Sequence, residues 1–246
     1  MKFFKHNMRF FTAIVGRSSI VFVASLLLLA CASHHVSQSV DAEGIAEKKV
    51  ALLATEQYLP VQIYDEKNQP IPYEITENPY LAHKRQVDKG SVLLFIEAQK
   101  AWRKEDSETA KQKLNVIIRN DDDLSGPWMM LGDIALAEKN YALAQQHYQQ
   151  GLKINSNNVN GYTALARVQR LQGKYNRAQN TLAKALALWP DFPEAHYNLS
   201  ILFDIYLNKT QQAQQHLNAY IFLEGENEES RQWLQQLNER ALAEES

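Results

Sequence analysis

The only cysteine of the chain, Cys31, ends an apolar run in the segment SLLLLACASHH, residues 25–35. A single thiol excludes a disulfide within the chain and a cysteine-rich zinc site. His34 and His35 follow closely, but apart from Cys31 no thiol and no nearby carboxylate accompanies them in sequence, which favours two solvated side chains over a metal site. Modification of the Cys31 sulfur is therefore the chemistry to consider at this position.

Residues 1–30 have the layout of a secretory signal peptide. They hold four Lys and Arg residues and no acid, followed by an apolar run of eleven residues at positions 20–30. A helix that crosses a membrane needs roughly 20 apolar residues, so the run is too short to predict a transmembrane anchor.

Two cleavage patterns overlap at Cys31. Ala30-Cys31-Ala32 fits the A-x-A pattern of ordinary signal peptidase, which would remove the cysteine. Leu28-Leu29-Ala30-Cys31 instead resembles the lipobox of bacterial lipoproteins, which implies cleavage before Cys31 and a diacylglycerol on its sulfur. The sole cysteine occupies the one position where that chemistry requires a thiol, so lipidation is favoured. The resemblance, with Ala32 and not aspartate following, further implies anchoring at the periplasmic face of the outer membrane. No cofactor other than this covalent lipid is expected.

The rest of the chain argues against several functions. The 26 basic residues minus the four in residues 1–30 leave 22 against 28 acidic residues, a net charge of −6, which gives no footprint for nucleic acid. The motifs G-x-S-x-G and H-E-x-x-H and a phosphate-binding glycine loop are absent from the sequence, so we predict neither an enzyme nor a small-molecule substrate. Residues 121–123 are three consecutive aspartates without the spacing of a calcium loop, so no metal is predicted.

Residues 31–90 are predicted to form a lipidated, largely irregular tether. Four of the seven prolines lie here, and each excludes a long helix around it: Pro60, Pro70, Pro72 and Pro79. Within the tether, residues 46–59 could form one short helix. VQIY (61–64) could pair with YEI (73–75) as a hairpin.

From residue 91 the chain repeats itself at a shift of 34 residues. The positions of Trp128, Leu131 and Gly132 correspond to those of Tyr162, Leu165 and Ala166, and then to His196, Leu199 and Ser200. The pattern W-x2-L-G, then A-x3-F, then a late proline resembles the tetratricopeptide repeat. The resemblance implies an all-α fold, an α-solenoid of stacked antiparallel helix pairs.

The repeat divides the array into four units, 91–124, 125–158, 159–192 and 193–226, followed by a capping helix and tail at 227–246. The first unit is the weakest match, as expected for a terminal repeat. In the fourth unit Ala213 falls one residue late, which predicts an insertion in the turn at 207–210. The last helix is amphipathic, as a capping helix requires.

The resemblance implies a concave face formed by the first helix of each unit, where a protein or peptide partner binds. The positions that packing leaves free on these helices are Phe95, Gln99, Trp102, Met129, Asp133, Leu136, Thr163, Arg167, Arg170, Tyr197, Ile201 and Asp204. The clamp for a C-terminal carboxylate found in some relatives is not supported, because Met129 and Asp133 occupy two of its positions. The sequence favours a membrane-anchored periplasmic scaffold for a cell-envelope complex. A pilotin-like factor for a pilus or secretion pore is an alternative, and an enzyme or an enzyme-activating subunit is a weaker one.

Overall fold

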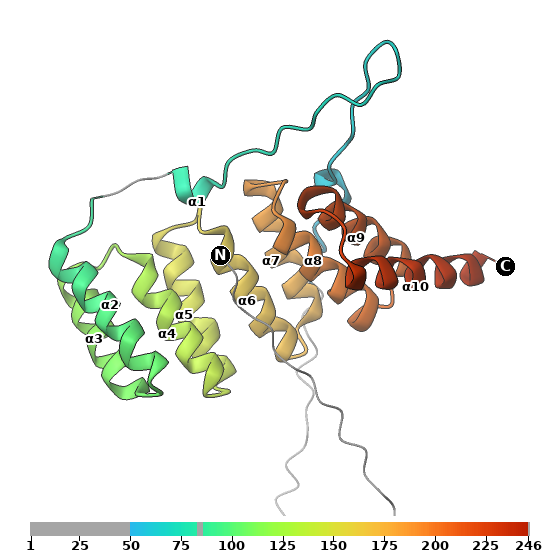
Figure 1. Cartoon of the computed structure of the whole chain (residues 1–246). Coiled ribbons are helices and arrows are strands. Elements are labelled where there is room, and N and C mark those ends of the chain that lie inside the picture. Colours follow the sequence, from blue (N-terminus) through green and yellow to red (C-terminus); the bar gives the residue numbers. More distant parts are fainter. Residues whose placement is uncertain (1–49, 83–85, 246) are drawn as a thin grey trace, which may run out of the picture. The chain divides into compact units, whose positions relative to one another are not determined.

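The computed structural model describes residues 50–82 and 86–245, and within these ranges the regular elements are helices (Figure 1). The all-α solenoid of four helix pairs and a C-terminal helix is confirmed. Helices neighbouring in sequence pack on each other, and each unit's second helix contacts the first helix of the next. The pairs are α2 (Lys89–Arg103) with α3 (Ser107–Asn120), α4 (Ser125–Ala137) with α5 (Tyr141–Ile154), α6 (Val159–Leu171) with α7 (Tyr175–Leu188), and α8 (Pro193–Ile201) with α9 (Thr210–Glu224); α10 (Glu228–Glu245) follows.

The turn inside each helix pair shows the repeat in its backbone. Glu105, Lys139 and Gly173 have φ values of 65°, 59° and 74°, and they lie 34 residues apart. A residue in the left-handed region lets the chain reverse after a helix, and only the third turn uses glycine for it. The residue after the turn then caps the second helix: Asp106 and Asn140 each accept a hydrogen bond from a backbone N–H.

The fourth unit accommodates its extra residue differently from the sequence prediction. After α8 the chain forms a π-helix at Leu202–Tyr206, in which the Leu207 N–H donates to the Leu202 carbonyl over 3.0 Å. The following turn has its left-handed residue at Asn208, 35 residues after Gly173. A π-turn adds one residue to a helix without breaking it. The insertion predicted in the turn at 207–210 thus lies within the helix.

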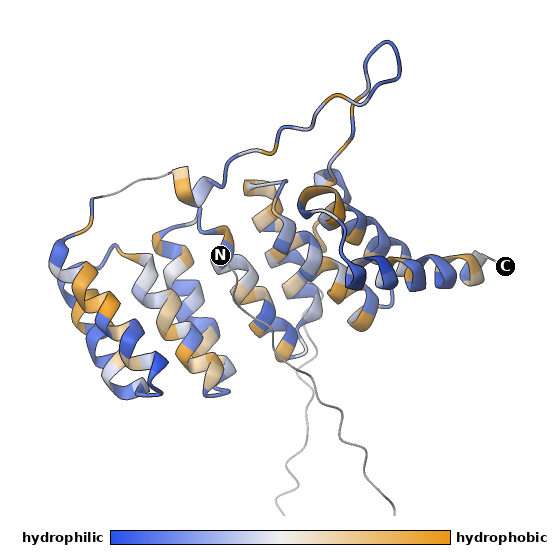
Figure 2. Ribbon diagram, viewed as in Figure 1, coloured by the Kyte–Doolittle hydropathy of each residue, from blue (hydrophilic) through white to orange (hydrophobic). Residues whose placement is uncertain are grey.

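The C-terminal helix α10 closes the array. It packs on α9, and Leu237 is fully buried against the core of the third and fourth units. Figure 2 shows α10 as largely hydrophilic elsewhere, which is what a solenoid needs at its solvent-facing end. Among the described residues no helix is both long and apolar enough to cross a membrane.

Residues 50–82, which we call the strap, contact the third and fourth units through residues 51–76, and Tyr80 near the end of the strap lies by the first two units. The strap contains a 3-10 helix, η1 (Glu56–Tyr58), and a short helix, α1 (Pro79–Ala82). The helix expected over 46–59 is wrong across the described residues 50–55, which have no helical structure. VQIY does form a hairpin, but its partner is the segment at Pro70 and Ile71 rather than YEI, because the turn closes after only a few residues.

Polar side chains of the array hold the strap at two places. Asn180 of α7 bonds both the Leu53 N–H, at 2.8 Å, and the Ala51 carbonyl, at 2.7 Å. Farther along the strap, the buried Asp191 accepts hydrogen bonds from the Tyr73 hydroxyl at 2.6 Å and from the Thr76 N–H at 2.8 Å. An extended segment without a core of its own is thus ordered by bonds to the array.

Candidate functional site

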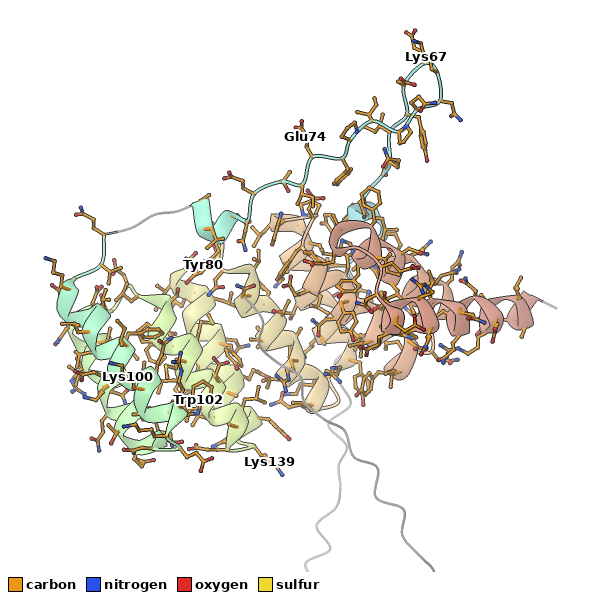
Figure 3. All side chains as sticks on the ribbon, in the orientation of Figure 1. Lys67, Glu74, Tyr80, Lys100, Trp102 and Lys139 are labelled. Carbon is orange, nitrogen blue, oxygen red and sulfur yellow. The ribbon has the colours of Figure 1, made fainter. Side chains whose placement is uncertain are left out.

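The first three units form a cavity of about 310 Å³ that five of the predicted partner-binding positions line. Trp102 and Gln99 belong to α2 and Met129 to α4, and the strap adds Tyr80. Figure 3 labels Trp102 and Tyr80. These side chains are half-buried, so their apolar surface is only partly covered within the chain. The predicted residues that line the cavity are Phe95, Gln99, Trp102, Met129 and Asp133. The structure therefore brings together five of the six predicted positions of the first two units, all but Leu136.

Close approach of backbones shapes this cavity. The Met129 thioether lies where a Cβ on Gly161 would come within 3.1 Å of its sulfur and 3.0 Å of its methyl group. A Cβ on Gly132 would lie 2.5 Å from the ring of Tyr148, which is buried. Glycine at these positions allows α5 and α6 to approach α4, so that Met129 and Tyr148 fill the space that remains.

Asp133 places a carboxylate in the cavity lining. Its Oδ1 accepts a hydrogen bond of 2.6 Å from the Tyr148 hydroxyl. Burial raises the pKa of Asp133, although the bond from Tyr148 and the charge of Arg167 act in the opposite direction. Burial, together with the charge of Asp133, also raises the pKa of Tyr148. The carboxylate is thus poorly solvated, and a donor or cationic group on a bound partner would stabilise it.

Three other predicted positions lie outside this cavity. Leu136 packs against the core of the second and third units. The Thr163 hydroxyl donates to the Asn160 carbonyl, at 2.9 Å, within its own helix. Arg167 is exposed, and its charge reaches Asp133.

In the fourth unit, α10 packs over the predicted positions. The Tyr197 ring meets the Trp233 ring edge-on, with centroids 5.8 Å apart. Asp204 accepts a hydrogen bond of 2.7 Å from the Trp233 indole N–H and a further bond from Arg240. Ile201, between them in sequence, is half-buried. These side chains position the capping helix.

Arg170 also makes an internal contact. Its guanidinium donates to the Tyr206 hydroxyl, at 2.8 Å, and lies 5.3 Å from the centre of that ring. Tyr206 ends the π-helix, so the extra residue of the fourth unit brings this ring to Arg170.

The predicted positions leave out eight residues that line the cavity: Tyr80, Gly126, Met130, Tyr148, Asn158, Asn160, Gly161 and Ala164. Tyr80 lies in the segment predicted to be an irregular tether, so no sequence pattern indicates that it lines the cavity. Asn158 caps α6 through a 3.1 Å bond from the Gly161 N–H, and an Asn directly before the first helix of a repeat could have indicated it. Tyr80 and Phe95 also line a neighbouring, mostly apolar cavity of about 680 Å³ between α1, α2 and α4.

A buried chain of hydrogen bonds links the strap to the fourth unit. His196 Nε2 lies 2.9 Å from the Pro190 carbonyl, the two Nδ1 atoms of His196 and His216 are 2.9 Å apart, and His216 Nε2 lies 2.8 Å from the Thr55 hydroxyl. The carbonyl can only accept, so His196 donates from Nε2 and accepts at Nδ1, His216 donates from Nδ1, and Thr55 donates to His216. With both rings neutral, every donor and acceptor of this chain has a partner.

Within the described residues no three His, Cys, Asp or Glu side chains are grouped as for a metal ion.

The described helix pairs, with their 34-residue spacing of turns, define a tetratricopeptide-like α-solenoid. In agreement with this, residues 135–196 match the family model described as "Tetratricopeptide repeat". Human "Tetratricopeptide repeat protein 8" is 27% identical over 88 residues, which are 36% of this chain and 16% of that protein. The match thus spans about a sixth of the length of this curated relative.

Solved structures share the fold at low sequence identity. MamA from Desulfovibrio magneticus RS-1 superposes with a TM-score of 0.54 at 19% identity, covering 63% of this chain and 88% of that one. PilF of Pseudomonas aeruginosa superposes with a TM-score of 0.57 at 18% identity, covering 63% and 71%. The coverage corresponds in extent to the helical array, and such arrays typically serve as protein-interaction scaffolds.

Proposed function

We propose that this protein is a lipid-anchored scaffold at the periplasmic face of the outer membrane. In this proposal its array binds an extended segment of another cell-envelope protein in the cavity of the first three units. The observation that carries the proposal is the convergence of Phe95, Gln99, Trp102, Met129 and Asp133 on one half-buried cavity. Aromatic and methionine side chains around a few polar groups are typical of peptide-binding surfaces.

The chemistry of the cavity favours a particular kind of segment. An apolar side chain would fit between Trp102 and Met129, and a basic or N–H group would meet the carboxylate of Asp133. Because α10 covers Tyr197 and Asp204 in the fourth unit, the bound segment would be short and would lie over the first three units. The proposed role is binding rather than catalysis.

The anchor rests on the sequence, because Cys31 lies outside the described residues. Two acyl chains on this residue would hold the protein stably at a membrane, since each buried methylene contributes about 0.8 kcal/mol. Cys31→Ser removes the sulfur that takes the lipid. We expect the altered protein to leave the membrane fraction, and retention there would contradict lipid anchoring.

The binding site is tested by affinity purification of the full-length protein from detergent-solubilised envelopes. A Trp102→Ala and Met129→Ala double variant should lose the captured partners, whereas Leu242→Ala should keep them. Leu242 is a matched control because it is an apolar side chain that is 69% exposed on α10, away from the cavity. Equal capture by both variants would refute the assignment of this cavity as the binding site. Capture of a secretin, with a pilus defect on deletion, would favour the pilotin-like role instead.

A further inference from the structure

The strap carries a short β-hairpin with its own backbone pairing. The Asp65 N–H donates to the Gln69 carbonyl and the Ile71 N–H to the Ile63 carbonyl, each over 2.9 Å. Between these pairs, Tyr64 and Pro70 form an antiparallel bridge. Asp65 Oδ1 also accepts hydrogen bonds from the Lys67 and Gln69 N–H groups, which holds the turn closed. Figure 3 labels Lys67 in this turn.

The two edges of this hairpin differ in what they offer. Tyr64 and Pro70 lie opposite each other between the two hydrogen-bonded pairs, so their own backbone groups point away from the hairpin. One edge carries Pro70 and Pro72. Proline has no backbone N–H to donate, so this edge cannot pair with another strand. The other edge carries the N–H groups of Gln62 and Tyr64, for which the described residues provide no backbone partner. One strand can therefore be added, and only on the 61–65 side.

One face of the hairpin is apolar and uncovered. Val61, Ile63 and Ile71 share this face by the alternation of side chains along paired strands. Their exposed fractions are 70%, 63% and 45%. A two-stranded hairpin is marginal by itself in water and gains stability when another strand or surface covers such a face.

The array holds this hairpin at both of its ends. Before it, the Thr55 hydroxyl bonds His216, and after it, Tyr73 and Thr76 bond Asp191. The Tyr73 ring also meets the Phe222 ring edge-on, with centroids 4.9 Å apart. Fixed ends lower the entropy that a partner must remove when it pairs with the strand.

The charges of the segment restrict the partner. Residues 56–77 hold five acidic residues and one lysine, a net charge of −4. A second copy of the hairpin would repeat this charge. Like charges facing each other across paired strands are destabilising, so the charge favours a different, basic partner over self-association.

We propose that residues 61–65 form a docking edge for an extended β-strand of another protein. The strand pairs with the outward backbone groups of Gln62 and Tyr64, and its alternate apolar side chains cover Val61, Ile63 and Ile71. Basic residues flank it, opposite the acidic strap. This edge is separate from the cavity of the first three units, so either site can bind without the other.

The test uses a display library of random nine-residue peptides, selected on the full-length protein in detergent. Enriched peptides should alternate apolar and other residues and carry Lys or Arg at their ends. Tyr64→Pro removes the outward N–H without removing a bond inside the hairpin, and should weaken these peptides at least tenfold. Tyr64→Val is the matched control, because it loses the aromatic ring and keeps the N–H, and it should bind as the natural protein does.

Several results would overturn the proposal. Enrichment of no peptide, or equal binding to Tyr64→Pro, would show that this edge takes no strand. Peptides lost with Trp102→Ala but not with Tyr64→Pro would belong to the cavity instead. A peptide-free dimer in ultracentrifugation that Tyr64→Pro abolishes would identify a second copy as the occupant. Hydrogen exchange gives an independent measurement, since bound peptide should slow exchange at the Gln62 and Tyr64 amides.

Discussion

The buried pair His196 and His216 should make the stability of the fold depend on pH. Both rings have no exposed surface. Burial lowers the pKa of His196 to about 4, although the Pro190 carbonyl and the charge of Asp191 act to raise it. Burial, together with the charge of His196, lowers the pKa of His216 to about 3. If both rings became charged, the Nδ1–H groups of His196 and His216 would face each other across the 2.9 Å contact.

The sign of the effect follows from where the protons bind. An unfolded histidine titrates near pH 6.5, so between about pH 6.5 and 4 the unfolded chain binds protons that the folded chain excludes. The stabilisation is therefore complete above about pH 6.5 and is lost as the pH falls. From pH 7.5 to 5, each histidine accounts for about 2 kcal/mol, and the pair for about 4 kcal/mol as an upper value.

The assay is urea unfolding followed by circular dichroism at pH 7.5, 6.5, 5.5 and 5. The comparison variant is His196→Gln with His216→Gln, which keeps polar groups at both positions but cannot titrate. We expect the natural protein to lose roughly 3 to 4 kcal/mol more than this variant over the range. Parallel pH profiles for the two proteins, within about 1 kcal/mol, would refute a buried, neutral histidine pair.

Three further substitutions test the packing around the cavity, the attachment of the strap and the attachment of α10. Gly132→Ala puts a methyl group against the buried Tyr148 ring, so thermal unfolding should show a loss of about 1 to 3 kcal/mol despite alanine's better helix propensity. Asp191→Ala removes the acceptor for Tyr73 and Thr76, and limited proteolysis should then cut the strap sooner, while unchanged cleavage would show that other contacts hold it. Asp204→Ala removes the partner of Trp233 and Arg240, and amide exchange in α10 should quicken while exchange in α4 stays the same.

Periodicity made the helical array predictable from sequence. A 34-residue spacing of small and aromatic residues repeats through Gly132, Ala166 and Ser200, because each helix pair buries the same kind of surface against the next. The capping helix followed from its amphipathic pattern. The spacing also revealed one extra residue in the fourth unit. It could not place that residue, because a π-turn and a longer loop shift the later positions equally.

The residues that line the cavity of the first three units were predictable only in part. Positions on the first helices of the first two units converge on one cavity, since they share a face of each helix. In the fourth unit, Tyr197 and Asp204 share that face but meet α10, which follows the final pair where another unit would otherwise stack. A pattern that specifies one repeat carries no information about which neighbour covers it.

The sequence by itself determined the repeated helix pairs of this protein with their small packing residues, and it predicts a signal with one candidate thiol for a lipid, which lies outside the described residues. The tertiary structure alone decided what the proline-containing segment does. Contacts such as Thr55 with His216 and Tyr73 with Asp191 join residues more than 100 positions apart. Such contacts have no period in the sequence, because they depend on where the folded array places a buried acceptor. They turn an expected spacer into an ordered strap that presents a β-hairpin.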